Sequence, residues 1–215
     1  MRGAKTTLSE AALTYLAEHS RQDAVLARVE RETAEMPRAM MQISPEQGAL
    51  MELLVRLTGA RDALEVGTFT GYSAICIARG LPENGRLTCL ELDQGYADIA
   101  QRNLEAAGIA DRVRIEVGPA GEALAAMPEE PAFDFVFLDA DKTGYPAYYE
   151  LLLPRMWSGA LLLIDNVLMD GDVVKPEAGS SAEVIAALND KIAADERVDA
   201  AFAMVADGLA FVRKR

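Results

Sequence analysis

The chain has 215 residues and a mass of 23.2 kDa, a size that favours one compact domain over two. It carries 21 basic and 34 acidic residues, which gives a net charge of −13 and a pI near 4.6. Because such a surface repels phosphate groups, we expect neither a nucleic-acid partner nor an anionic membrane surface as a partner.

The metal-binding and redox residues are few. Cys76 and Cys89 are too few for a disulfide framework or a cysteine-based zinc site, and a single histidine, His19, excludes a polyhistidine metal site. No apolar stretch resembles a signal peptide or approaches the ~20 residues of a membrane span. These features predict a cytoplasmic protein.

The N-terminal part is predicted to be helical. Apolar residues recur at helical spacing from about residue 8 to 36, with a break at 21–23. A further helix is predicted to begin at Ser44, because Ser44-Pro45-Glu46-Gln47 has the arrangement of a capping box. No linker or repeat divides the chain, so residues 1–215 are expected to form a single domain with a helical segment at 1–40.

From residue 60 onward, short apolar runs alternate with helical patterns. Alternation of this kind predicts a parallel sheet with helices on both faces, an α/β fold. The predicted strands are 63–66, 87–91, 113–117, 133–138 and 160–164.

The C-terminal pattern differs. A helix over 182–194 precedes an apolar run at 200–205, and Asp207-Gly208 separates this run from a second one at 209–212. Asp-Gly between two apolar runs is typical of a β-hairpin, so an antiparallel pair is expected to close the sheet.

In open parallel sheets, ligands bind beyond the carboxyl ends of the strands. Acidic residues stand at four of the five predicted strand ends, which favours a binding site there. The residues at these ends are Glu65, Gly67, Glu91, Ala120, Asp139, Asp141, Lys142, Asp165 and Asn166.

The first strand end suits a nucleoside ligand. Gly67 allows a tight turn, but the segment lacks the G-x-G-x-x-G spacing that seats a pyrophosphate, which argues against a nicotinamide dehydrogenase. Glu91 lies 24 residues after Gly67 and can accept hydrogen bonds from ribose hydroxyls. The alternative is that Gly67 only turns the chain and Glu91 is solvated.

The last two strand ends suit a divalent cation. Asp139, Asp165 and Asn166 offer three oxygen ligands without nitrogen or sulfur, a set that suits Mg²⁺, Mn²⁺ or Ca²⁺ rather than zinc. Lys142 places an ammonium group beside them. The alternative is that Asp139, Asp165 and Asn166 cap the helices that follow.

From Met41 onward the sequence resembles the class I, metal-dependent O-methyltransferases that use S-adenosylmethionine, a group that includes catechol and caffeoyl-CoA O-methyltransferases. The likeness rests on the order and spacing of four motifs. They are Glu65-Val66-Gly67-Thr68-Phe69-Thr70-Gly71-Tyr72-Ser73, Phe137-Leu138-Asp139-Ala140-Asp141-Lys142, Ile164-Asp165-Asn166-Val167 and Asp207-Gly208-Leu209.

The resemblance implies a Rossmann-like, seven-stranded, mostly parallel sheet of order 3-2-1-4-5-7-6, and a homodimer. It implies that residues 1–40 contribute to the substrate pocket or the dimer. It assigns metal binding to Asp139, Asp165 and Asn166, and catalysis to Lys142 with Asp139 and Asn166. The implied cofactor contacts are Met41, Ile43, Glu65, Gly67, Thr68, Ser73, Glu91, Ala120, Asp139 and Asp141.

The function predicted from these features is transfer of a methyl group from S-adenosylmethionine to a hydroxyl of a catechol-like vicinal diol. A divalent cation, in the first place Mg²⁺, is expected to assist. One alternative is a methyltransferase acting on a hydroxylated tRNA uridine, which the net charge of −13 disfavours. Another is a non-catalytic nucleoside-binding module, which would have no need of Asp139, Lys142, Asp165 and Asn166 together.

Overall fold

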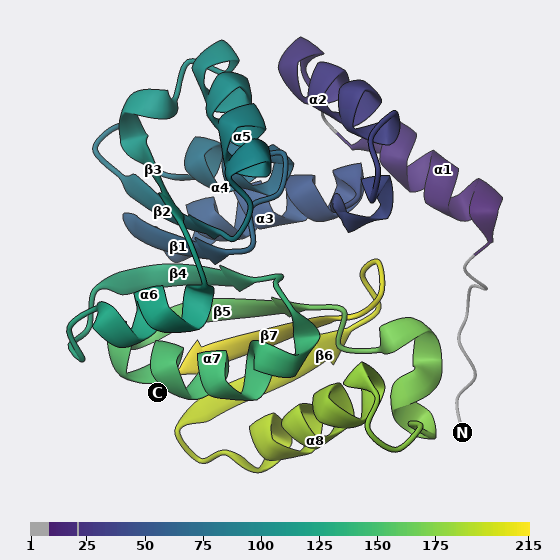
Figure 1. Ribbon diagram of the computed structural model, residues 1–215, viewed down its shortest axis with the longest axis vertical. Coiled ribbons are helices and arrows are strands. Elements are labelled where there is room, and N and C mark those ends of the chain that lie inside the picture. Colours follow the sequence, from purple (N-terminus) through teal and green to yellow (C-terminus); the bar gives the residue numbers. More distant parts are fainter. Residues whose placement is uncertain (1–8, 21) are drawn as a thin grey trace.

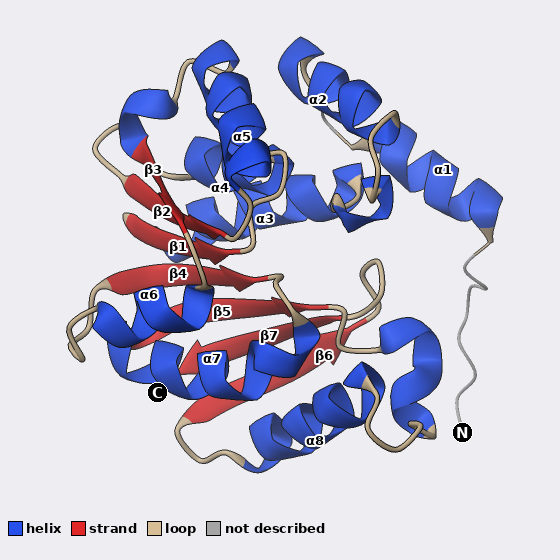
Figure 2. Ribbon diagram, in the orientation of Figure 1, coloured by secondary structure: helices blue, strands red, loops and turns tan. Residues whose placement is uncertain are grey.

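The computed structural model describes residues 9–20 and 22–215, which form one seven-stranded sheet between two layers of helices (Figures 1 and 2). The strand order is β3-β2-β1-β4-β5-β7-β6. Strands β1 to β5 pair in parallel, and β7 runs antiparallel to both β5 and β6. The fold and strand order predicted from the sequence are confirmed. The strands are β1 Asp62–Val66, β2 Arg86–Glu91, β3 Val113–Val117, β4 Phe133–Leu138, β5 Met156–Asp165, β6 Val198–Ala203 and β7 Leu209–Lys214.

Each face of the sheet is covered by its own group of helices (Figure 2). One face packs against α3 (Pro45–Thr58), α4 (Tyr72–Gly80) and α5 (Gln94–Ala106). The other packs against α6 (Ala120–Ala126), α7 (Tyr145–Leu152) and α8 (Ser181–Ala194). The remaining elements are α1 Glu10–His19, α2 Ala24–Ala34 and the short 3₁₀ turns η1 Ala39–Met41, η2 Ala110–Arg112, η3 Lys142–Gly144, η4 Leu153–Arg155 and η5 Met169–Val174.

The buried strands show why this sandwich forms. On β4, Phe135 and Phe137 face the α3 side, whereas Val136 and Leu138 face the α7 side, and none is more than 1% exposed. Burying one such side chain stabilises the fold by roughly 1.5–3 kcal/mol. A strand that is apolar on both faces belongs in the middle of a sheet, and its polar end then projects beyond the layers.

Helix α2 supports the loop that follows β1. Gln22 Nε2 donates a hydrogen bond of 2.8 Å to the hydroxyl of Tyr72, and Thr33 Oγ1 donates one of 3.0 Å to Thr70 Oγ1. The helix break predicted at 21–23 is confirmed where the chain is described, since Asp23 caps α2, whereas residue 21 lies outside the described part. The N-terminal segment is therefore fastened to the first strand end.

The C-terminal hairpin is present, but its connection is longer than a two-residue turn. Residues 204–208 join β6 to β7. Asp207 Oδ1 accepts the N–H of Asp170, and Asp207 Oδ2 accepts a hydrogen bond from Asn166 Nδ2. Gly208 has φ +83° and would place a Cβ 2.5 Å from Leu168 Cγ. The loop is long because it reaches over to the end of β5.

Three smaller expectations are settled by the structure. Cys76 and Cys89 are free, buried thiols, and His19 is an exposed residue at the end of α1. No helix within residues 9–20 and 22–215 is long and apolar enough to cross a membrane.

Candidate active site

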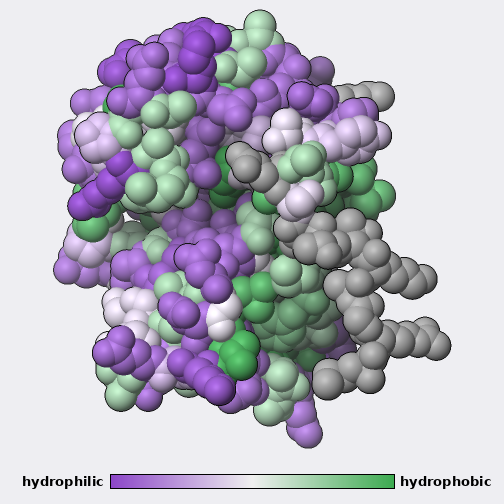
Figure 3. Space-filling model, turned by 90° about the vertical axis from the view of Figure 1, so that its right-hand side faces the viewer, coloured by the Kyte–Doolittle hydropathy of each residue, from purple (hydrophilic) through white to green (hydrophobic). Residues whose placement is uncertain are grey.

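A cavity of about 790 Å³ opens at the carboxyl ends of the central strands. Seen from the right-hand side of Figure 1, the surface is hollowed between the α2–α5 half and the rest of the molecule (Figure 3). Most of the residues singled out from the sequence line this cavity. They are Met41, Ile43, Gly67, Thr68, Ser73, Glu91, Ala120, Asp139, Asp141, Asp165 and Asn166.

Gly67 is required where β1 meets β4. Its φ is +92°, and an added Cβ would lie 1.9 Å from the carbonyl oxygen of Asp139. The Gly67 N–H donates to the carbonyl of Leu90 at 2.9 Å, and the Asp139 N–H donates to the carbonyl of Val66 at 2.8 Å. Three strand ends are thus tied together by their backbones, which leaves no room for a side chain at Gly67.

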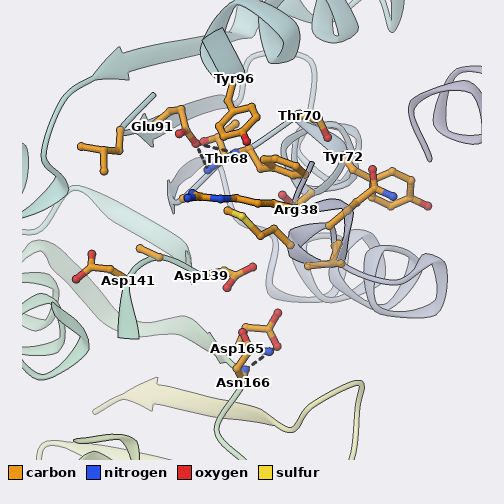
Figure 4. A pocket seen from close by; sticks show the side chains of 18 of the residues that line it. Arg38, Thr68, Thr70, Tyr72, Glu91, Tyr96, Asp139, Asp141, Asp165 and Asn166 are labelled. Atoms are coloured by element: carbon orange, nitrogen blue, oxygen red, sulfur yellow. Dashed lines mark hydrogen bonds between the residues drawn. The ribbon is translucent and has the colours of Figure 1, made fainter. Parts of the chain in front are cut away.

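Glu91 is buried and held by main-chain donors. Its Oε2 accepts the N–H groups of Thr68 at 3.0 Å and Phe69 at 2.7 Å, and its Oε1 accepts the N–H of Asp93 (Figure 4). Phe69 adopts φ +51°, unusual for a large side chain, and its ring packs edge-on against Tyr96 at 4.7 Å. The carboxylate is therefore fixed at the cavity wall beside an aromatic pair that can flank a planar base.

Glu65 lies behind the wall of the cavity, not in its lining. It is completely buried, and neither carboxyl oxygen has a hydrogen-bond partner. Burial raises the pKa of Glu65 to about 7, partly opposed by the polar groups of Ser73, Cys89 and Thr68 and increased by the negative charge of Asp139. A carboxyl group without partners inside a ligand-binding wall is a candidate for hydrogen bonding to that ligand.

Lys142 pairs with Asp139 beneath the cavity floor. Its Nζ lies 2.7 Å from Asp139 Oδ1 and donates a second hydrogen bond of 2.7 Å to the hydroxyl of Tyr145. Lys142 is not in the cavity lining, and its side chain is 19% exposed. The hydroxyl of Tyr148 donates to Asp141 Oδ1 at 2.6 Å. Two of the carboxylates are therefore each oriented by a neighbouring side chain.

Asp165 and Asn166 stand at the end of the adjacent strand and line the same cavity as Asp139 (Figure 4). Asp165 Oδ1 accepts the N–H of Asn166, whose φ of +56° turns the chain sharply here. Burial raises the pKa of Asp165 to about 7, and the charge of Asp139 adds to the rise, whereas Gln47, the Asn166 N–H and Lys142 oppose it. A carboxyl that is this costly to ionise benefits from a cation.

The oxygen donors fit a hard divalent cation. Asp139, Asp165 and Asn166 offer two carboxylates and an amide to one cavity, which is a ligand set of the Mg²⁺ type. Within the described residues no three His, Cys, Asp or Glu side chains gather as a metal site, because the third member here is an amide. The donor chemistry therefore supports a cation held by protein oxygens and water.

Sequence reasoning missed Gln47 and interpreted its motif wrongly. Ser44 precedes α3 but its hydroxyl makes no capping bond. The side chain of Gln47 instead donates to Asp165 Oδ2 at 2.9 Å. The capping box is wrong because a partner 118 residues away, invisible to local spacing, competes for the amide.

The N-terminal segment and its junction with α3 also line the cavity. Met40 is 85% exposed, and the side chain of Arg38 extends across the opening (Figure 4). Arg38 is the only basic residue among the described residues that line the cavity, and it adopts φ +64°. Tyr148 is a further lining residue, whereas Tyr145 and Tyr149 are fully buried in the helix packing.

Comparison with known proteins agrees with this geometry. Residues 17–215 match the family model described as O-methyltransferase. A probable caffeoyl-CoA O-methyltransferase of Dictyostelium discoideum is 34% identical over 98% of this chain and 94% of its own length. A catechol O-methyltransferase of Niastella koreensis is 42% identical over 71% of this chain and 69% of its own length.

Solved structures show the same arrangement. An O-methyltransferase from Bacillus cereus in complex with SAH is 35% identical, with a TM-score of 0.86 over 95% of this chain and 97% of that one. TomG from Streptomyces achromogenes in complex with SAM is 30% identical, with a TM-score of 0.86 over 96% of this chain and 99% of that one. Fold and site together define an S-adenosylmethionine-dependent methyltransferase. The chain belongs to the O-methyltransferase family.

Proposed function

We propose that this protein is a divalent-metal-dependent O-methyltransferase that acts on one hydroxyl of a catechol-like vicinal diol. The observation that carries the proposal is the shared cavity: Asp139, Asp165 and Asn166 line the same space as Gly67 and Glu91. A binding module would need only the second group. The printed names of relatives, caffeoyl-CoA and catechol O-methyltransferase, support an acceptor with adjacent aromatic hydroxyls.

The cofactor would lie along the first two strand ends. Glu91 is placed to accept hydrogen bonds from ribose hydroxyls, and Phe69 and Tyr96 flank the region where an adenine would stack. Met41, Ile43, Ala120 and Asp141 complete the lining. S-adenosylmethionine, when bound, supplies an electrophilic methyl group, and the protein's task is to align it with the acceptor oxygen.

Asp139, Asp165 and Asn166 would hold the cation. A phenol has a pKa of ~10, so little of it is ionised at neutral pH. A bound divalent cation favours the ionised oxygen and fixes the two hydroxyls of a vicinal diol. The ammonium group of Lys142, 2.7 Å from Asp139, adds positive charge beside this position and stabilises the developing phenolate.

The test is an assay with methyl-labelled S-adenosylmethionine and matched acceptors. We expect label transfer to 3,4-dihydroxybenzaldehyde but not to 4-hydroxybenzaldehyde, loss of transfer with EDTA, and recovery with Mg²⁺. Equal transfer to the monohydroxyl compound, or full activity in EDTA, would contradict the proposal. Salt-sensitive labelling of tRNA would favour the nucleic-acid alternative instead.

Two further expectations follow from the family resemblance and remain proposals: a homodimer, and a contribution of residues 1–40 to the acceptor side. Arg38 and Met40 line the cavity, which supports the second. Sedimentation equilibrium tests the first, and a monomer across the micromolar range would overturn it. A cytoplasmic location likewise stays a prediction.

A further inference from the structure

Three polar side chains at the start of α3 have buried atoms without hydrogen-bond partners. Gln42 Oε1, Ser44 Oγ and Gln47 Oε1 are all inaccessible to solvent and unpartnered, and all three residues line the cavity. Each such atom costs about 1–3 kcal/mol when it is left unpaired. This junction therefore favours something other than its own stability.

Gln47 is the most constrained of the three. It is completely buried, and its Nε2 donates a hydrogen bond of 2.9 Å to Oδ2 of Asp165, which is 4% exposed. At this position of the first helical turn, Gln47 would ordinarily reach back to the cap residue Ser44. The helix forgoes that interaction, which is worth about 1 kcal/mol, and directs the amide across the cavity to a different strand.

Asp165 has no other side-chain donor. The N–H of Asn166 holds Oδ1, and Gln47 holds Oδ2, so one backbone group and one neutral amide determine the orientation of the carboxylate. Asp139 is held differently, by the ammonium group of Lys142. A neutral donor fixes a carboxylate without neutralising its charge, which leaves that charge available to a cation.

We propose that Gln47 is a positioning residue that holds the Asp165 carboxylate in the orientation needed to share a divalent cation with Asp139 and Asn166. The inference rests on the proposed metal-dependent function. Donors of this kind behind a metal ligand typically change metal affinity by ~10–100-fold when removed.

The test compares two glutamines that stand on the same wall. Gln47→Leu removes the bond to Asp165, whereas Gln42→Leu removes an amide that also lines the cavity but has no bond to Asp165. Mn²⁺ affinity is measured on cofactor-free protein by calorimetry and by electron paramagnetic resonance, with SAH affinity and the melting temperature as controls. Gln47→Met serves as a second apolar variant if Gln47→Leu fails to fold.

We expect Gln47→Leu to weaken Mn²⁺ binding ~10–100-fold, with SAH affinity within about threefold of the unmodified protein. Gln42→Leu should leave Mn²⁺ affinity unchanged. In the transfer assay, Gln47→Leu should need more metal for half-maximal rate, with most of kcat recovered at saturating metal.

The outcomes separate the two claims. Equal Mn²⁺ affinity in Gln47→Leu and the unmodified protein, or an equal loss in Gln42→Leu, would overturn the role of Gln47 and leave the methyltransferase proposal standing. If the unmodified protein binds no Mn²⁺ at all, the metal-dependent mechanism itself fails, and the inference about Gln47 fails with it.

Discussion

The two ends of the cavity are held in place by different kinds of contact. At the nucleoside end, Gly67 and Glu91 are fixed by backbone groups: strand-end N–H groups, a turn with positive φ, and a carboxylate that accepts three main-chain N–H bonds. At the acidic end, Asp139 and Asp165 are fixed largely by the side chains of Lys142 and Gln47.

This difference has a functional consequence. A backbone-built site changes little when a single side chain is replaced, whereas a side-chain-built site depends on each donor separately. The nucleoside end should therefore resist all but steric changes, and the acidic end should lose its function residue by residue. The following substitutions test that contrast.

The largest effect is expected for Gly67→Ala. A Cβ at this position would lie 1.9 Å from the Asp139 carbonyl oxygen, in a backbone with φ +92°. We expect loss of SAH binding and a fall of more than ~3 kcal/mol in the free energy of unfolding, measured by urea denaturation. Gly59→Ala is the matched control, because Gly59 has φ +67° with nothing within 4 Å of an added Cβ, and it should cost only ~1–2 kcal/mol. Equal costs in the two variants would remove the steric argument.

Asp165→Ala should abolish metal-dependent transfer while leaving SAH affinity within about threefold. The carboxylate is one of two that line the acidic end, and its loss leaves Asp139 alone to offer charge to a cation. Since burial raises the pKa of Asp165 to about 7, its removal should not lower the melting temperature much. Parallel loss of SAH binding would show that the two ends are not independent.

Lys142→Met should lower turnover ~10²–10³-fold, because the ammonium group beside the reacting oxygen is lost. Its Nζ occupies Asp139 Oδ1 at 2.7 Å, so the same substitution frees that oxygen. We therefore expect Mn²⁺ affinity to rise severalfold while kcat falls, measured on the same preparation. A fall in Mn²⁺ affinity would mean that Lys142 supports the carboxylate instead of competing for it.

Glu91→Gln tests the nucleoside end. The amide keeps the shape but replaces one acceptor by a donor facing the N–H groups of Thr68, Phe69 and Asp93. Hydrogen bonds to a charged group contribute about 1.5–3 kcal/mol, so SAH affinity should fall ~10–100-fold with Mn²⁺ affinity unchanged. Calorimetric titration with each ligand distinguishes this pattern from general misfolding.

The same contrast explains what the sequence could predict. The sheet order and hairpin follow from alternating apolar runs and a family likeness, and Gly67 is recognisable because only a local turn needs it. Asp139, Asp165 and Asn166 are recognisable as strand-end polar residues. In each case the signal lies within a few neighbouring positions.

The remaining site residues depend on contacts between distant segments. Gln47 has the spacing of a capping box, and only the packing of α3 against the end of β5 shows that its amide goes to Asp165. Glu65 looks like a cavity residue from its motif, yet its strand position buries it behind the wall. Periodicity predicts which face a residue takes, but not which distant partner it meets there.

The smallest effect concerns carboxylates outside the cavity, whose pKa values shift in the opposite direction from those of Glu65 and Asp165. Hydrogen bonds from Arg197 and Lys191 lower the pKa of Glu150 to about 2, and Arg197 lowers the pKa of Asp195 as well. Because the folded pKa values lie below the unfolded ones, the unfolded state takes up protons first as the pH falls. This contribution to stability is present above about pH 4.5 and is lost towards pH 2.

Arg197→Met should therefore reduce the difference in unfolding free energy between pH 7 and pH 3, by less than ~1 kcal/mol, because the ion pairs are partly exposed. Arg114→Met is the control, since Arg114 is 76% exposed and pairs only with Glu116 at 3.2 Å. Urea denaturation at both pH values measures the change. An equal change in both variants would assign it to net charge and not to the Arg197 cluster. SAH and Mn²⁺ affinities should be unaffected in either case, because none of these residues lines the cavity.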